Sequence, residues 1–312
     1  AEGNDHPDFG KRGISLPEGF LNMTAPALSS LTLLRERETA AALRIGLERV
    51  LHPGHLALAA VRAASGNAAL ILQTPEADFD GFTALRAREC DLVVARPLAL
   101  LEPSAANVEA IGCIFASLGG VLVREDRLGK LRGGEVLLVA TSVARPLADG
   151  LCRRVLQGWA GNQGFAVAET QVVIEEVAGH QPADVLRDGF DAAWLAYAPI
   201  DALAAARRGL AVRLVTAEDA GLPPFAALEL VARKDRPAEE VARHEALLAD
   251  LEQAALRLTA DPEGAVALWR SASGDSSETA AAMVRAALPF LQTRIERRPL
   301  YRQALRELFE DV

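Results

Sequence analysis

Hydrophobic and polar positions along residues 43–64 define the clearest local unit of the chain. Leu43, Ile45 and Leu47 alternate with polar or small residues, which predicts a short strand. The turn 52–55 (His-Pro-Gly-His) interrupts this pattern, and the alanine-rich apolar run after it predicts a helix. A strand, a tight loop and a helix form the repeating unit of open α/β sheets, in which ligands bind at the carboxyl ends of strands, near helix N-termini. We therefore expect this loop to form one wall of a small-molecule site.

Short apolar runs separated by turns continue through the middle of the chain. Runs of this kind, bounded by Gly, Pro or polar clusters, predict buried strands. The predicted strands are 68–72, 91–95, 121–123, 135–140, 170–175, 191–196, 212–215 and 227–231, with a further apolar run at 110–115. Helices are predicted at 82–88, 147–159 and 182–187. In the longest of them an apolar side chain recurs every fourth residue, and Pro146 fits the first turn.

Two segments, 85–97 and 186–199, repeat the same order of features. In each, a helix ends in arginine, an aspartate begins a strand (Asp91 and Asp191), and a proline stops it. Although agreement at so few positions can arise by chance, this echo predicts two copies of a similar α/β unit.

The chain ends in a helical region and begins with a polar arm. Apolar residues at helical spacing predict helices at 239–258, from 262 onward, at 277–287 and at 299–308. Residues 1–22 are polar and aperiodic, which predicts a loose arm, and 28–42 could form a short helix. Alternating α and β units followed by helices indicate the α/β fold class.

The composition of the chain limits the classes of function that it can have. The 312 residues are enough for two domains, and the net charge of -9 argues against a nucleic-acid partner. Cys90, Cys113 and Cys152 are odd in number and lack metal-type spacing, so we expect buried free thiols. No apolar run reaches the length of a membrane span, and no secretory leader is visible. Either a leader was removed before Ala1, or Met23 is a native start behind added residues.

The order of elements resembles the periplasmic-type solute-binding proteins of ABC transporters, specifically the nitrate, sulfonate/taurine and thiamine-precursor (pyrimidine) group, which has the type-2 binding-protein fold. The stretches that carry the resemblance are Leu43–Ala64, Leu85–Pro97, Leu118–Gly150, Leu186–Pro199, Leu222–Asp235, the late helix ending at Trp269, and Leu288–Arg294. They span about residues 43–312.

The resemblance implies an organisation and a role. Residues 43–133 plus 226–312 would form one lobe, residues 134–225 the other, and residues 1–42 an arm. Two crossing strands would act as the hinge, and a small organic or anionic solute would bind in the cleft as the lobes close. An ABC-transporter permease is the implied partner, and the periplasm the implied location if a leader has been removed.

Two departures from the family leave an alternative open. The arm is longer than usual and no leader is visible, so a cytoplasmic enzyme or ligand sensor on the same fold remains the second interpretation. The effector half of a LysR-type regulator is disfavoured, because residues 1–42 are too few and too aperiodic for a winged helix–turn–helix.

Candidate ligand-binding residues occupy the strand-to-helix loops. His52 and His55 could donate to an anionic or carbonyl group, or could simply cap the turn. Metal binding by the pair is less favoured, because no carboxylate or third histidine lies close in sequence. Thr141 and Ser142 occupy the corresponding loop of the second lobe, where they could cap a helix. The resemblance implies that these two contact the ligand.

Four further candidates lie at strand ends and at the return crossing. Arg96 could pair with an anion or form a surface salt bridge. Trp194 and Tyr197 could stack on a planar or alkyl group, although a buried tryptophan more often belongs to the core. Phe225 could line the cleft edge. We expect His55→Ala and Tyr197→Ala to weaken binding and to leave the stability of the unliganded protein nearly unchanged.

Motifs for catalysis are weak. The glycine pairs at 119–120 and 133–134 lack the spacing of a dinucleotide or phosphate loop, and no cysteine lies in a recognised catalytic context. We therefore predict no catalytic residue, no metal and no cofactor. The expected protein binds a small molecule without chemistry.

Overall fold

The computed structural model describes residues 42–47, 51–65, 70–73, 80–141, 146–177, 181–223 and 225–296. By its internal contacts the chain divides into two compact units, Ala1–Ala42 and Leu43–Val312. The strands and helices of the described residues all belong to the second unit. The predictions for the arm, for Ser142 and for the helix at 299–308 lie outside the described residues.

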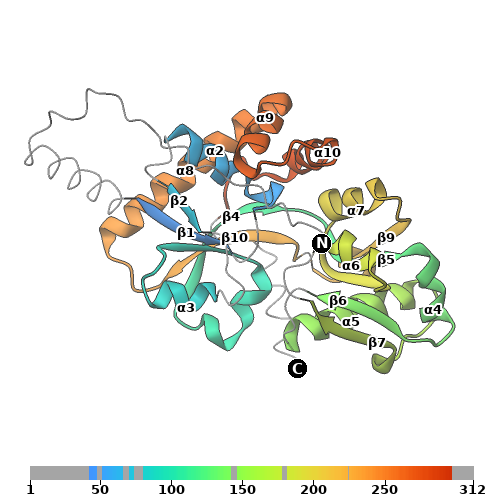
Figure 1. Cartoon of the computed structure of the whole chain (residues 1–312). Coiled ribbons are helices and arrows are strands. Elements are labelled where there is room, and N and C mark those ends of the chain that lie inside the picture. Colours follow the sequence, from blue (N-terminus) through green and yellow to red (C-terminus); the bar gives the residue numbers. More distant parts are fainter. Residues whose placement is uncertain are drawn as a thin grey trace, which may run out of the picture. The chain divides into compact units, whose positions relative to one another are not determined.

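Ten strands lie within the described ranges, and they form two five-stranded sheets (Figure 1). The strands are β1 Leu43–Leu47, β2 Leu70–Gln73, β3 Leu92–Ala95, β4 Val108–Ala116, β5 Gly119–Arg124, β6 Leu137–Thr141, β7 Val172–Glu176, β8 Ala192–Tyr197, β9 Val212–Thr216 and β10 Ala227–Arg233. Their central residues coincide with the apolar runs of the sequence, because buried strands are continuous stretches of apolar side chains.

The helices of the described ranges are α2 Leu56–Ala64, α3 Gly81–Arg86, α4 Leu128–Arg132, α5 Pro146–Asn162, α6 Pro182–Arg187, α7 Ala198–Arg207, α8 Ala238–Ala260, α9 Pro262–Ser273 and α10 Glu278–Ala287. The start of α9 shows how local sequence sets a helix boundary. Pro262 occupies the first turn, and Asp261 Oδ1 accepts from the N–H of Gly264 at 2.9 Å. Across the described residues, no helix is both long and apolar enough to cross a membrane.

The two sheets share one topology. The first has the order β2-β1-β3-β10-β4, and the second the order β7-β6-β8-β5-β9. In each, three parallel strands are followed by an antiparallel strand from the other half of the chain, β10 or β5. The chain therefore crosses from the first sheet to the second between β4 and β5, and returns between β9 and β10.

The first crossing differs from the sequence-based boundary at residue 133. Because β5 pairs with β8 and β9, residues 119–124 belong to the second sheet. The apolar run 121–123 resembles its predecessors in sequence, and only its hydrogen-bond partners show which sheet it joins. The return crossing falls near residue 225, between β9 and β10.

An aspartate directly precedes the central strand of each sheet, β3 or β8, and ties it to its parallel neighbour. Asp91 Oδ2 accepts from the backbone N–H of Arg44 at 2.8 Å, and Asp191 Oδ2 accepts from that of Leu138 at 3.0 Å. The backbone N–H of each aspartate donates to the carbonyl of the same partner. The repeated pattern in the sequence therefore corresponds to a repeated structural feature. In both sheets the aspartate extends the hydrogen-bond ladder by one residue, just before the strand begins.

Helices cover both faces of each sheet. On the first sheet, α2 and α8–α10 bury one face around Leu92 and Leu230, and α3 packs on the other through Phe82 and Leu85 (Figure 1). On the second sheet, α5 covers one face, and α6 and α7 cover the other. Leu151, Val155 and Trp159 of α5 are all buried, which confirms the four-residue spacing that predicted this face.

Each core also receives side chains from the other half of the chain. Leu98, in the 3₁₀ segment Pro97–Leu101 after β3, lies in the core of the second sheet. Tyr197 and Ile200, at the start of α7, lie in the core of the first sheet. Helix α7 packs against α10. This exchange places the end of β3 and the end of β8 side by side.

All three cysteines are buried thiols, as the sequence predicts. Burial raises the pKa of Cys90 to about 11 and also raises the pKa of Cys152. Thiols with raised pKa values are poor nucleophiles, so these cysteines serve as small apolar core residues.

Candidate binding site

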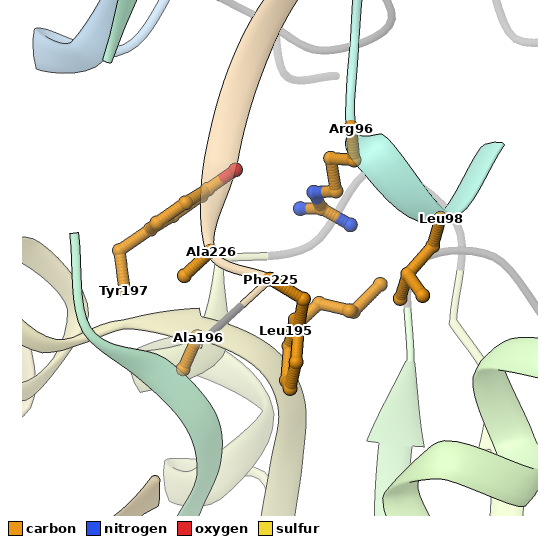
Figure 2. A pocket seen from close by; sticks show the side chains of 7 residues that line it. All are labelled: Arg96, Leu98, Leu195, Ala196, Tyr197, Phe225 and Ala226. Carbon is orange, nitrogen blue, oxygen red and sulfur yellow. The ribbon is translucent and has the colours of Figure 1, made fainter. Parts of the chain in front are cut away.

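A small cavity lies where the return crossing before β10 meets the end of β8 and the residues after β3. Its described lining comes from the residues after β3, from the end of β8 and from the segment before β10 (Figure 2). The lining residues are Arg96, Leu98, Leu195, Ala196, Tyr197, Phe225 and Ala226. The cavity has a volume of about 10 Å³, which is roughly the room of one water molecule. Among the eight predicted site residues, Arg96, Tyr197 and Phe225 line it.

Arg96 presents guanidinium donors at this cavity. It follows β3 directly and precedes the 3₁₀ segment Pro97–Leu101. Its Nε and Nη2 atoms are buried and have no hydrogen-bond partner among the described residues. The Cζ atom lies 5.8 Å from the centroid of the Tyr197 ring, a contact that favours a cation but supplies no acceptor. Because buried donors in proteins normally find an acceptor, Arg96 has the capacity to receive one from a ligand.

Tyr197 connects the two sheets. Its backbone N–H donates to Asp201 Oδ2 at 2.7 Å, and its hydroxyl lies 3.4 Å from the carbonyl oxygen of Ala227 at the start of β10. Its ring centroid lies 5.7 Å from that of Phe115 and 5.3 Å from that of His52. The side chain is 2 % exposed, so the ring is part of the core as well as part of the cavity wall.

His52 and His55 cap the turn that they flank. His52 Nδ1 accepts from the N–H of Gly54, and His55 Nδ1 accepts from the N–H of His52, both at 3.1 Å. The interpretation of the pair as turn caps is therefore confirmed. Neither residue lines the cavity, although the His52 ring contacts Tyr197.

The burial of His55 and Tyr197 changes the expectation for their alanine variants. Both side chains are 2 % exposed. Removing a buried ring leaves a cavity that typically costs about 3–5 kcal/mol for an aromatic residue. The structure therefore predicts that His55→Ala and Tyr197→Ala lower the stability of the unliganded protein. A role in binding remains a prediction for both.

Trp194 and Phe225 pack against each other, with ring centroids 5.2 Å apart. Phe225 reaches the cavity and Trp194 does not. Trp194 is 1 % exposed, and its Nε1 has no hydrogen-bond partner in the described part of the chain. The alternative weighed from the sequence, a tryptophan in the core, fits this position.

Thr141 ends β6 and is fully buried. Its carbonyl oxygen accepts from the N–H of Val177 at 2.8 Å. It does not line the cavity, and its neighbour Ser142 lies outside the described residues, so ligand contact by these two stays a prediction.

Sequence reasoning missed Leu98, Leu195, Ala196 and Ala226. Leu98 follows Arg96-Pro97, which ends the third predicted strand. This position after a strand end was the one sequence feature that could have indicated Leu98 as a lining residue. The position of Leu195 depends on how β8 pairs with β5, which no local pattern encodes. Within the described ranges, no group of three or more His, Cys, Asp or Glu side chains comes together as a metal site would require.

Comparison with known proteins gives a partial sequence match. Residues 149–265, from α5 into α9, match the family described as NMT1/THI5 like. No curated protein matches the chain.

Solved structures match almost the whole length of the chain. The alkanesulfonate-binding protein SsuA from Xanthomonas axonopodis pv. citri, bound to MOPS, is 18% identical with a TM-score of 0.61, over 87% of this chain and 93% of that one. The periplasmic aliphatic sulphonate binding protein SsuA from Escherichia coli is 16% identical with a TM-score of 0.60, over 87% of each chain. The ligand-binding component of an ABC-type import system from Staphylococcus aureus, with zinc bound, is 12% identical with a TM-score of 0.62, over 86% of this chain and 91% of that one.

The chain has the fold of ABC-importer solute-binding proteins. The resemblance drawn from the sequence is thereby confirmed, together with the two-lobed α/β fold class. At these identities the likeness establishes the fold. All three structures are named as binding components and none as an enzyme.

Proposed function

We propose that this solute-binding fold captures a small organic anion between its two sheets and acts as the substrate-binding component of an ABC importer. That role would place the protein outside the cytoplasmic membrane, with an ABC permease as its partner. The observation that carries the proposal is the position of Arg96 at the cavity.

A guanidinium with two buried donors that lack a partner among the described residues favours an anion. Desolvating a charged group without a compensating acceptor is unfavourable, and the Nε and Nη2 donors of Arg96 lack one among the described residues. A sulfonate, carboxylate or phosphate oxygen would supply it through a charge-assisted hydrogen bond. Because the chain as a whole carries a net charge of -9, attraction for an anion has to come from a local group of this kind.

The rest of the lining favours an organic group next to the anion. Leu98, Leu195 and Phe225 contribute apolar walls opposite or beside the guanidinium (Figure 2). Small-molecule sites generally combine apolar surface with a few placed polar groups. Two of the similar structures are named for sulfonates, one of them bound to MOPS, which are anions with an organic part.

Binding requires the walls of the cavity to separate. A volume of about 10 Å³ admits roughly one water molecule and no organic anion. The two crossings, β4 to β5 and β9 to β10, are the places where a hinge can act between the sheets. The ligand then stabilises the closed form by contacts that only this form offers.

A cytoplasmic enzyme or sensor was the second interpretation of the sequence, and it has no specific support here. The described cavity lining contains no nucleophile beside a base and no acidic pair.

Titration calorimetry with MOPS and 1-butanesulfonate tests the proposal. We expect Arg96→Gln to bind both anions about 10- to 100-fold more weakly, because it loses hydrogen bonds to a charged group. The melting temperature without ligand should stay unchanged or rise, because two buried donors that lack an acceptor among the described residues are removed. Arg213→Gln is the matched control: Arg213 lies 5.5 Å from the Trp159 ring and does not line the cavity.

The control should bind both anions as the wild type does. Equal affinities for wild type and Arg96→Gln would contradict the assignment of Arg96. Failure of the wild type to bind either anion would contradict the proposed class of ligand.

A further inference from the structure

Leu195 has a backbone conformation that leucine rarely adopts. Its φ angle is +63°, in the left-handed region where Cβ crowds the backbone and where glycine is favoured. Among the described residues the only other non-glycine residue with positive φ is Arg88. Arg88 is exposed in a turn after α3, whereas Leu195 is 8 % exposed within β8.

This conformation forms a bulge in the pairing of β8 with β5. Gly120 pairs with Ala196 and Val121 pairs with Trp194, so Leu195 is the extra residue on its strand. Its place lies beyond the part of β8 that pairs with β6, which ends at Ala193. Bulges of this kind bend a strand and redirect the side chains that follow.

The bulge brings Leu195 to the face of the sheet that carries the cavity. Side chains of a regular strand alternate between the two faces. Ala192 and Trp194 contact the core beneath α5, and Ala193 and Ala196 contact the core beneath α6 and α7. In a regular strand Leu195 would lie on the face of Ala193, but it lies with Trp194 instead, and its side chain lines the cavity together with Arg96.

On β5 the position next to the bulge, which pairs with Ala196, is a glycine, Gly120. A Cβ at Gly120 would lie 1.9 Å from the carbonyl oxygen of Val215, so no side chain fits there. At 195 glycine would adopt the observed φ angle without strain, yet a leucine is present. When a residue that lines a cavity keeps a strained backbone conformation, the role of its side chain in that cavity best explains why the strain is retained.

We propose that Leu195 sets the size of the apolar end of the bound anion, as the wall opposite the guanidinium of Arg96. The inference rests on the proposed function and adds a specificity-determining residue to it. The bulge fixes how far the leucine side chain projects into the cavity, and hence how much organic group fits between it and the charged head.

Calorimetry with sulfate, methanesulfonate, 1-butanesulfonate and 1-hexanesulfonate tests this inference. In the wild type, affinity should rise by up to about fourfold per buried methylene until the chain meets Leu195, and then fall. In Leu195→Ala, which removes three carbons, the optimum should move to a longer chain, while sulfate binding changes by less than about threefold. Leu195→Met, which nearly conserves volume, keeps the test available if the alanine variant unfolds, and its flexible chain should broaden the optimum.

Arg88→Gly is the control for strain alone. It relieves the other left-handed residue, which does not line the cavity, so the melting temperature of this variant should equal or exceed that of the wild type and its chain-length preference should be unchanged. An unchanged ratio of hexanesulfonate to methanesulfonate affinity in both Leu195 variants overturns the inference and leaves the proposed function standing. Loss of folding in both variants overturns it too, because Leu195 would then be a core residue only. If the wild type binds none of the four anions, the proposed function fails first.

Discussion

The binding hypothesis depends on single residues whose environment or backbone conformation is energetically unfavourable. Arg96 is one, since its buried Nε and Nη2 donors have no acceptor among the described residues. Its identity as a candidate was predictable, because arginine after a buried strand is a typical anion ligand. The bulge at Leu195 was not predictable, because a φ angle of +63° follows from pairing with a strand that is distant in sequence, with Gly120 facing Ala196.

His244 is a second buried group whose charge matters. It lies in α8, 2 % exposed, with Nε2 4.0 Å from Glu240 Oε1, and Glu240 is held by Arg233 at 2.9 Å. Neither ring nitrogen has a hydrogen-bond partner within the described ranges. Burial, and after it the nearby Arg236 guanidinium, lower the pKa of His244 to about 4.

The lowered pKa predicts how stability depends on pH. Between about pH 6.5 and pH 4 the unfolded chain binds a proton at this histidine and the folded chain does not, so the free energy of unfolding falls as pH falls. We expect the contribution to reach at most roughly 3 kcal/mol. In His244→Met this part of the slope should disappear, as measured by urea unfolding at a series of pH values. The same slope in wild type and variant would show that His244 titrates normally.

At the scale of elements, hydrophobic pattern predicted most of the strands and helices. Buried strands read as apolar runs, and the aspartates before β3 and β8 marked the repeat. The hydrophobic pattern could not predict to which sheet β5 belongs, because an antiparallel crossing strand shows the same kind of apolar run as its parallel neighbours. What distinguishes β5 is its opening Gly119-Gly120, which allows a close approach to the second crossing: a Cβ at Gly119 would lie 2.2 Å from that of Ala226.

Gly120→Ala tests this close approach. The new Cβ would lie 1.9 Å from the Val215 carbonyl oxygen and 2.9 Å from the Thr216 Cα, both backbone atoms that cannot move aside cheaply. We expect a loss of roughly 3 kcal/mol or more in the free energy of unfolding. Gly150→Ala in α5 is the control, because nothing lies within 4 Å of its Cβ position and alanine favours the helix by about 0.5–1 kcal/mol. Equal stability of Gly120→Ala and wild type would mean that β5 and β9 are not paired as described.

At the scale of the molecule, the two halves exchange core residues. Leu98 lies in the second core, and Ile200 lies in the first. Sequence could predict two similar halves, but not this exchange, because the residues involved lie at the ends of elements where local pattern is weakest. Because of this exchange, the stability of each half depends on the other. The cavity lies at the junction of the two halves.

Calorimetric unfolding tests the coupling. We expect the wild type to unfold in one transition, because each half buries side chains of the other. Ile200→Ala, which empties a fully buried site, should lower the free energy of unfolding by about 2–5 kcal/mol and separate the transition into two. Two well-separated transitions in the wild type would contradict the coupling.

The central claim is that an organic anion is held between the sheets with its charge on Arg96. A crystal structure of the protein grown with 2-bromoethanesulfonate tests it most directly, since anomalous scattering from bromine locates the organic end of the ligand. We expect sulfonate oxygens within hydrogen-bond distance of the Arg96 guanidinium and bromine toward Leu195 and Phe225. A ligand bound elsewhere, with Arg96 making no contact to it, would contradict this mode of binding.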